Sequence, residues 1–327
     1  MVALHKGHAV GFRAYFATKW TAGKENRTFI MLNPGDTVVH PDHRNMGLSL
    51  EMGLRAIEEY DSRFQIFLNS SSSVNAVPGY RKMGFLPLAP KFPVILYGKE
   101  KSAKDYLPSK LRKSIKRSRM YTLIRSLPGE KRKVVASQTG TGSQRCGDIV
   151  MAEEPKPDEM FNLMINKNQP KINKIKIYQD EVFYRWRFLN NRKKYSFFYH
   201  QEGGEITGYL VLEVSALDAR HGKIVDYADR SGRALECILE YIVRSAAFSK
   251  LSIISYGLEE DLLRILQRLD IGRYGSRREA WESQDAELHL LVRPVKKTLS
   301  EEDWFVAGLD MRNFENWEVK PICDDGA

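Results

Sequence analysis

The stretch from Val39 to Leu54, VHPDHRNMGLSLEMGL, combines residue types that together can hold an anion. The short β-branched run before it reads as a strand, and the apolar spacing after Gly47 fits a helix with one buried stripe. A helix N-terminus offers unpaired backbone N–H groups and the positive end of its dipole. Arg44 adds a charge that can grip a phosphate, and Gly47 allows close backbone approach. The alternative is an ordinary strand-to-helix connection with a surface arginine, since short glycine motifs often match by chance.

Length and composition indicate a globular chain with room for two cores. The 327 residues are 43% hydrophobic and 28% charged. No apolar run approaches the roughly 18 residues of a membrane span, and no apolar signal segment opens the chain, so we expect a cytoplasmic protein. The three cysteines (Cys146, Cys237, Cys323) lack paired ligand spacing, which predicts free thiols rather than a disulfide framework or a zinc site.

The net charge of +10 is concentrated in one segment. Between Lys101 and Lys133 there are twelve Lys or Arg residues against two acids, so the remainder of the chain is close to neutral. A nucleic-acid patch is conceivable, but no aromatic interleaving or recognised binding fold accompanies these charges. A basic interdomain segment that helps to attract a phosphate-rich small molecule is the favoured interpretation.

The two halves of the chain follow the same pattern. GHAVGFRAYF (7–16) matches GEITGYLVLE (204–213), because in each a polar turn precedes a strand with glycine at the same place. DTVVHPDHR and KIVDYADR then lead into helices, and the short apolar runs FQIFLN and LSIIS follow. The order strand, strand, strand, helix, strand, helix, strand predicts duplication of one α/β unit.

At this point the sequence resembles the GNAT acyltransferases. Their acyl-CoA signature, Arg or Gln followed by x-x-Gly-x-Gly or Ala, lies between the fourth strand and the next helix. The matching residues are Arg44, Asn45, Met46, Gly47, Leu48 and Ser49, with serine in place of the final small residue. A second GNAT element, Tyr-x-x-x-Gly-Phe, has its counterpart in YRKMGF, Tyr80 to Phe85. The resemblance implies an α/β fold of two tandem GNAT-like units, each with a mixed, mainly antiparallel central sheet flanked by helices.

A narrower resemblance is to tandem GNAT proteins of bacterial polysaccharide gene clusters, including N-acyltransferases that modify nucleotide-linked amino sugars. DTVVHPDHR, VPGYRKMGF, WRF (186–188) and DWFVAGLD (303–310) carry it, although Leu309 stands where that group has an acid. This resemblance implies an acyl-CoA-dependent N-acyltransferase that acylates the amine of an amino sugar by direct amine attack on the thioester. The alternative is a catalytically inactive GNAT-derived binding or scaffold protein of such a cluster.

The resemblance also implies a domain plan. We expect residues 1–100 to form an acyl-CoA-binding GNAT domain, 101–147 a basic connector, and 148–327 a second, degenerate GNAT-like domain with a C-terminal tail. DIVMA, PDEMFNLMI and DEVFYRWRFL supply the opening strand and helices of the second domain. Its own loop, DRSGRAL (229–235), has arginine and glycine at the wrong spacing, so acyl-CoA should bind the first domain.

The first domain has no counterpart of the strand and two helices with which a GNAT domain opens. The apolar side chains of Val10, Phe12, Tyr15 and Ile30 would then lack their usual cover. We expect that cover to come from the connector or from another chain, because unpaired strand edges are costly. We also expect Met1 to be an internal methionine, or a wrongly chosen start, of a longer protein.

Acyl transfer to an amine needs a neutral amine, a stabilised oxyanion and a proton for the departing thiolate. The resemblance assigns the pantetheine and oxyanion contacts to the backbone around Val38, Val39 and His40, where the fourth strand of the family separates from its neighbour. Tyr80 matches the tyrosine that protonates the sulfur, with simple packing as its alternative role. Asp36 and His40 are candidate general bases, since histidine titrates near neutral pH. A turn or cap role for His40, a strand-entry role for Asp36, and deprotonation through ordered water stay open.

Trp186 and Arg187 are the candidate acceptor ligands, because an aromatic face and a guanidinium suit a base and a diphosphate. Packing of the tryptophan in the core is the alternative. The implied co-substrate is acetyl-CoA or another acyl-CoA, and the acceptor is a small-molecule amine. Neither a metal, a nucleic-acid partner nor membrane insertion is implied, and a homodimer is compatible with the sequence.

Overall fold

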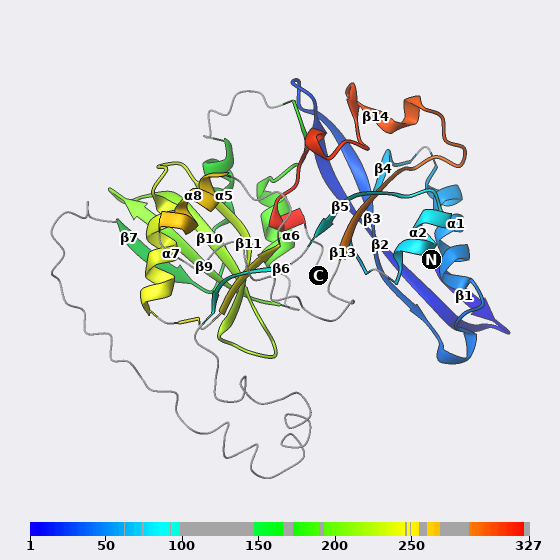
Figure 1. Cartoon of the computed structure of the whole chain (residues 1–327), viewed down its shortest axis with the longest axis horizontal. Helices are drawn as coiled ribbons and strands as arrows, with labels where there is room; N and C mark the ends of the chain where they lie inside the picture. The colour runs from blue at the N-terminus through cyan, green and yellow to red at the C-terminus, as the bar shows by residue number, and fades with distance from the viewer. Residues whose placement is uncertain are drawn as a thin grey trace, which may run out of the picture.

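The structure is a computed structural model of the whole chain. It describes residues 1–61, 63–73, 75–91, 93–98, 147–165, 173–189, 193–245, 247–248, 250–254, 260–268 and 288–323. The predicted basic connector, apart from Gly147, lies outside the described residues. Figure 1 shows two lobes side by side, one built mainly from the first half of the chain and one mainly from the second.

The first half follows the predicted order of elements. Its elements are β1 (Val2–His5), β2 (His8–Ala22), β3 (Arg27–Val39), the 3-10 turn η1 (Pro41–His43), α1 (Leu48–Tyr60), β4 (Ile66–Ser73), α2 (Val77–Lys82), β5 (Leu86–Lys91) and β6 (Pro93–Gly98). The turn between β1 and β2 has two residues, Lys6 and Gly7, with φ of +50° and +81°. Left-handed residues at both central positions match the right-handed twist of a tight hairpin.

The second half repeats this order after an opening strand and two helices. Its elements are β7 (Asp148–Ala152), α5 (Pro157–Ile165), β8 (Ile175–Ile177), α6 (Glu181–Phe188), β9 (Lys194–Glu202), β10 (Glu205–Val214), β11 (His221–Asp229), α7 (Ala234–Ser245), β12 (Lys250–Ile254), α8 (Glu260–Arg268) and β13 (Leu288–Pro294). The turn between β9 and β10 again has two left-handed residues, Gly203 and Gly204. The predicted correspondence between the two hairpins is therefore confirmed, whereas β8 was not predicted.

The C-terminal tail consists of short elements. They are η4 (Glu302–Trp304), β14 (Phe305–Val306), β15 (Leu309–Asp310), η5 (Phe314–Asn316), β16 (Trp317–Glu318) and η6 (Pro321–Cys323). The tail folds onto the first sheet, because Trp317 meets Trp20 edge to face at 5.8 Å and both rings are buried. Leu309, which departs from the resembled pattern, is itself a buried core residue.

The described strands form two main sheets, each of which includes strands from both halves of the chain. The first has the order β16-β8-β2-β3-β4-β13-β5 with β1 beside β2, and the second has the order β6-β12-β11-β10-β9-β7. Strand β13 comes from the second half but lies between β4 and β5, and β6 comes from the first half but pairs with β12 (Figure 1). The predicted boundary near residue 147 separates the halves along the chain, but it does not separate the sheets.

The open edge of β2 is covered by this chain itself. Strand β1 pairs with the start of β2, and β8 pairs with its last three residues, Trp20 to Ala22. One core then joins Trp20, Met31 and Ile66 of the first sheet to the second lobe and the tail. This source of cover was not predicted from the sequence. The Phe12 and Ile30 side chains stay 49% and 37% exposed, whereas Val10 is buried.

In each sheet one parallel strand pair separates after a short contact. Among the described residues, β3 pairs with β4 at Met31 and Leu32, and β11 pairs with β12 at three positions starting from His221. Beyond these positions no further partners join the two strands of either pair among the described residues, which is the pattern of strands that separate. Both halves therefore contain the splayed parallel pair that the resemblance implies.

Two predictions that concern the whole chain can be compared with the structure. Cys237 on α7 is disulfide-bonded, so the prediction of a free thiol was wrong for this residue, whereas Cys323 is free and buried. In the described part of the chain, no helix combines the length and apolarity needed to cross a membrane.

A buried polar chain links α6 to the second sheet. The Tyr209 hydroxyl donates to Asp226 at 2.8 Å and lies 2.9 Å from the Tyr184 hydroxyl. All three side chains are at most 1% exposed. Burial raises the pKa of the Asp226 carboxyl to about 6, although the hydrogen bond from Tyr209 and the positive charge of Lys320 oppose this shift. Burying the ionised carboxylate therefore costs free energy at neutral pH.

We expect Asp226→Asn to flatten the dependence of stability on pH. The folded pKa lies above the unfolded one, so the carboxyl contributes stability that is present below about pH 4 and is lost as pH rises through about 6. The loss is at most about 3 kcal/mol. Urea unfolding between pH 4 and 7 measures it, with the exposed Asp218→Asn as control. An unchanged pH slope in Asp226→Asn would contradict the assignment.

Candidate functional site

The connection from β3 to α1 leaves the start of the helix open. Asn45 and Gly47 both have left-handed backbones, with φ of +62° and +79°. Gly47 occupies the N-cap position and supplies no capping side chain, and a Cβ placed on it would meet nothing within 4 Å. The first helical hydrogen bond runs from Glu51 N to Gly47 O. The preceding N–H groups of α1 have no hydrogen-bond partner among the described residues, as an anion site requires.

Arg44 is held at the mouth of this loop. Its Nε donates to Val39 O at 3.2 Å, and the side chain is exposed. His40 N donates across to Val10 O at 2.8 Å. Because hydrogen-bonding direction alternates along an antiparallel strand, Val39 must point its N–H and C=O away from β2, toward the diverging strand β4. Of the three predicted backbone positions, Val39 is thus the one that directs its N–H toward β4, whereas the N–H groups of Val38 and His40 point toward β2.

The corresponding loop of the second half is filled by its own side chains. The Asp229 carboxylate accepts from Gly232 N at 2.7 Å and from Leu235 N at 3.0 Å. Ser231 Oγ accepts from Ala234 N at 3.0 Å. A carboxylate therefore occupies the N-terminus of α7, where a phosphate would have to bind. The sequence indicated this difference only through the altered spacing of arginine and glycine in the second loop.

Tyr80 lies on α2, on the side of the first sheet that α1 covers. Its ring is 6% exposed and meets Phe85 edge to face at 4.9 Å. It shares a core cluster with Leu32 and Phe67, the residues at which β3 and β4 part. Tyr80 therefore packs in this core, and its position there is beside the point where β3 and β4 part.

Arg13 on β2 is a residue that the sequence analysis missed. Its side chain is 2% exposed, donates to Ser49 O at 3.1 Å, and places its guanidinium carbon 4.9 Å from the centre of the Tyr80 ring. Arg13 Nε has no hydrogen-bond partner among the described residues. A buried cation thus joins the first turn of α1 to Tyr80. The sequence could have indicated that Arg13 faces α1. Side chains two residues apart on a strand share a face, and the ring of Tyr15 packs against Tyr60 of α1.

The two candidate bases stand apart from each other. His40 accepts from Asp42 N through Nδ1 at 3.3 Å and caps η1, which is the turn role considered from the sequence. Asp36 is exposed on β3, four residues earlier, a separation of about 13 Å along a strand. Asp36 lies where the register between β2 and β3 shifts, between the pairs Tyr15–Pro34 and Arg13–Thr37.

The two predicted acceptor ligands have different surroundings. Trp186 is 51% exposed on α6, and its ring lies 6.1 Å from Phe16 of β2. Arg187 is buried, and its guanidinium donates to the Tyr195 hydroxyl at 3.3 Å. Trp186 is therefore available at the surface where α6 meets the first sheet, while Arg187 belongs to the interior of the second lobe.

Comparison with known proteins identifies the fold. No protein-family model and no curated protein matches this sequence. A GCN5-related N-acetyltransferase from Anabaena variabilis superposes with a TM-score of 0.54 at 10% identity over 90% of this chain. An N-myristoyltransferase from Saccharomyces cerevisiae, solved with myristoyl-CoA, superposes with a TM-score of 0.50 at 13% identity, covering 96% of this chain and 72% of that one. The fold is that of the GNAT acyltransferases. The chain spans 62% of the length of the Anabaena protein.

The GNAT fold gives the two sheets a common description. Strands β1 to β4 and their counterparts β9 to β12 follow the same order in both units, with one parallel pair in each. The position next to the parallel pair is filled by the exchanged strands, β13 beside β4 in the first sheet and β6 beside β12 in the second. The first GNAT unit thus has an open helix N-terminus beside its splayed pair, and the second unit has a capped one.

Proposed function

We propose that this protein is an acyl-CoA-dependent N-acyltransferase that binds acyl-CoA in its first GNAT unit. The main support for this proposal is the difference between the loops that precede α1 and α7. The N-terminus of α1 has no side-chain cap, whereas the N-terminus of α7 is capped by Asp229. A pyrophosphate needs free N–H groups at a helix N-terminus, so the first unit is the better acyl-CoA site. In the proposed complex the binding segment is the loop from Arg44 through Asn45, Met46, Gly47 and Leu48 to Ser49.

The gap between β3 and β4 is the proposed path of the pantetheine arm. Beyond Leu32 the two strands diverge, and Val39 directs its N–H toward the gap. A backbone N–H aimed at the thioester oxygen would stabilise the oxyanion that forms when the amine attacks. Val38, by contrast, would act as a supporting strand residue.

Tyr80 is the proposed proton donor to the departing thiolate. The guanidinium of Arg13 lies over its ring, with the guanidinium carbon 4.9 Å from the ring centre. Arg13 also fixes α1 through Ser49 O. It is therefore proposed as a positioning residue that couples the binding loop to Tyr80.

The amine acceptor is proposed to approach from the face of the sheet opposite α1. Trp186 lies on that side, where α6 meets Phe16 of β2. Asp36 is the favoured base, because His40 is engaged as a turn cap. Trp186 offers an aromatic face for a nucleotide base. A nucleotide-linked amino sugar is the proposed acceptor class, and acetyl-CoA is the simplest acyl donor.

We expect Gly47→Val to weaken acetyl-CoA binding at least about tenfold, a loss of about 1.4 kcal/mol. A β-branched residue is strained at φ +79° and fills the space over the α1 N-terminus. Gly232→Val is the matched control, because Gly232 is left-handed at φ +75° with equal space around it, but it lies in the capped loop. Calorimetry measures the affinity, and thermal unfolding shows the strain that both variants share.

The opposite pattern in these two variants would defeat the proposed site. If Gly47→Val binds acetyl-CoA as the unaltered protein does, the first loop does not hold the pyrophosphate. If Gly232→Val alone loses affinity, the second GNAT unit holds it.

We expect acetyl-CoA to release thiol in the presence of a nucleotide-linked amino sugar, and not with the same sugar already N-acetylated. Tyr80→Phe should lower kcat about a hundredfold, a typical size for a lost acid, while acetyl-CoA affinity stays unchanged. Tyr60→Phe is the control, because Tyr60 belongs to the same aromatic group around Tyr15. A panel of such nucleotides in a thiol-release assay tests the acceptor class. Tight acetyl-CoA binding without turnover on any amine would instead support the inactive binding or scaffold protein.

A further inference from the structure

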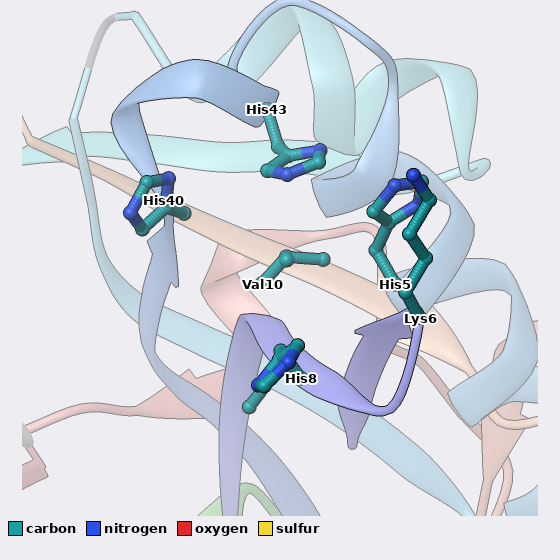
Figure 2. Close-up of a pocket in the computed structure, with 7 residues that line it drawn as sticks. His5, Lys6, His8, Val10, His40 and His43 are labelled. Atoms are coloured by element: carbon teal, nitrogen blue, oxygen red, sulfur yellow. The ribbon is translucent and has the colours of Figure 1, made fainter.

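Four of the seven histidines surround one pocket at the edge of the first sheet. The pocket has a volume of about 330 Å³ and is lined by His5, Lys6, His8, Ala9, Val10, His40 and His43. Figure 2 shows the imidazoles of His5, His8, His40 and His43 grouped around the Val10 side chain, which forms the apolar floor. His5 is the last residue of β1 and His8 the first of β2, while His40 directly precedes η1 and His43 is its last residue.

The lining of this pocket is rich in groups that can carry positive charge. None of its seven lining residues is acidic, and Lys6 contributes an ammonium. The carboxylate of Asp42 lies 3.8 Å from His40 Nδ1, but that side chain is 84% exposed. The titratable or charged groups around the pocket are His5, Lys6 and His8 from the β1–β2 side, and His40, Asp42, His43 and Arg44 from the connection after β3.

The imidazoles are close enough to influence one another. The ring centres of His5 and His43 are 5.1 Å apart, and those of His40 and His43 are 5.9 Å apart. Protonation of two such neighbours brings like charges together, which disfavours the doubly charged state. An oxyanion between the rings would remove this repulsion and accept hydrogen bonds from the imidazolium N–H groups.

A metal ion fits these residues less well. Imidazole is a common metal ligand, but in the described part of the chain no group of three or more His, Cys, Asp or Glu side chains is arranged to hold a metal. The ammonium of Lys6 would also repel a cation, whereas it would attract an anion.

We propose that this pocket binds an oxyanion of the phosphomonoester class through protonated histidines. The site is distinct from the α1 N-terminus, but it adjoins it in the chain, because His43 directly precedes Arg44. Two sources of the anion share this chemistry: the 3′-phosphate of the acyl-CoA and a phosphate of the acceptor. The assignment of a source rests on the proposed function, while anion binding itself rests on the pocket.

The affinity for the anion should rise as the pH is lowered, because protonated imidazoles carry the positive charge that attracts an anion. A phosphomonoester itself loses one charge near pH 6, which would mask the effect. Sulfate keeps its charge throughout this range, so it is the cleaner probe. Binding of sulfate should raise the pKa of the pocket imidazoles, because the anion stabilises their charged form.

Imidazole NMR titrations of the full chain test the proposal, with sodium sulfate compared against sodium chloride at equal ionic strength. We expect sulfate to raise the pKa of His5 and His43 by about half a unit or more, equivalent to about a threefold change in protonation constant. His200, His221 and His289 lie outside the pocket and serve as internal controls. The double variant His5→Gln/His43→Gln should remove the sulfate response of His8 and His40, and His221→Gln should not.

Two results would overturn the proposal: sulfate shifts none of the four pocket imidazoles, or stoichiometric Zn²⁺ shifts them while sulfate neither shifts them nor competes. Calorimetry with acetyl-CoA and dephospho-acetyl-CoA at pH 6 and 8 then identifies the source. A pH-dependent advantage of acetyl-CoA that disappears in His5→Gln/His43→Gln assigns the 3′-phosphate. Equal pH dependence of the two compounds, with the sulfate response intact, assigns the acceptor. Sulfate binding without any acetyl-CoA binding would retain the pocket and reject the proposed function.

Discussion

The pairing of β13 with both β4 and β5 holds the first sheet together. Strand β13 lies between these two strands and pairs antiparallel with each, from Leu288 to Pro294 on the β4 side. Without it, β4 and β5 would have no partner between them, and the first sheet would end at β4. Strand β6 makes the reciprocal contribution beside β12. Because each sheet is completed by a strand from the other half, neither half can form its observed sheet from its own strands alone.

The two units share a strand order but differ at the helix that follows the parallel strand pair. Both have the same strand order, the same two-residue hairpin turn and the same splayed parallel pair. They differ at the helix that follows the splay: α1 starts at an uncapped, left-handed Gly47, while Asp229 caps α7. The shared fold positions the two helices alike, and under the proposed function the caps from Asp229 and Ser231 leave the N-terminus of α1 as the one that receives an anion.

The local features could be predicted from the sequence, because they depend on residue types at short spacing. Glycines at 7 and 204 indicated the paired hairpins, and Gly47 before a helix indicated the open N-terminus. The strand exchange could not be predicted in this way, since the apolar pattern of β13 does not specify which strands it joins. The burial of Arg13 likewise depends on the position of α1 over β2, which is a tertiary contact.

Two other features could be recognised in the sequence but were interpreted incompletely: the cap of α7 and the adjacent residues Trp186 and Arg187. Asp229 and Ser231 are ordinary helix-capping residue types, and the sequence analysis considered only the spacing of arginine and glycine around them. Trp186 and Arg187 are adjacent on α6, and their neighbours place one at the surface and one in the interior. The amphipathic pattern of this short helix does not show which of the two residues is buried. One reason is that α6 has apolar neighbours on two sides, since Trp186 also contacts Phe16 of the first sheet.

Hydrogen exchange of the backbone amides, with and without saturating acetyl-CoA, tests the central claim most directly. The claim is that the two helix N-termini differ in their ability to bind a pyrophosphate. The account predicts that acetyl-CoA slows exchange in the segment 47–51 at the start of α1 and leaves the segment 232–236 at the start of α7 unchanged. Slower exchange at 232–236 with no change at 47–51 would contradict it.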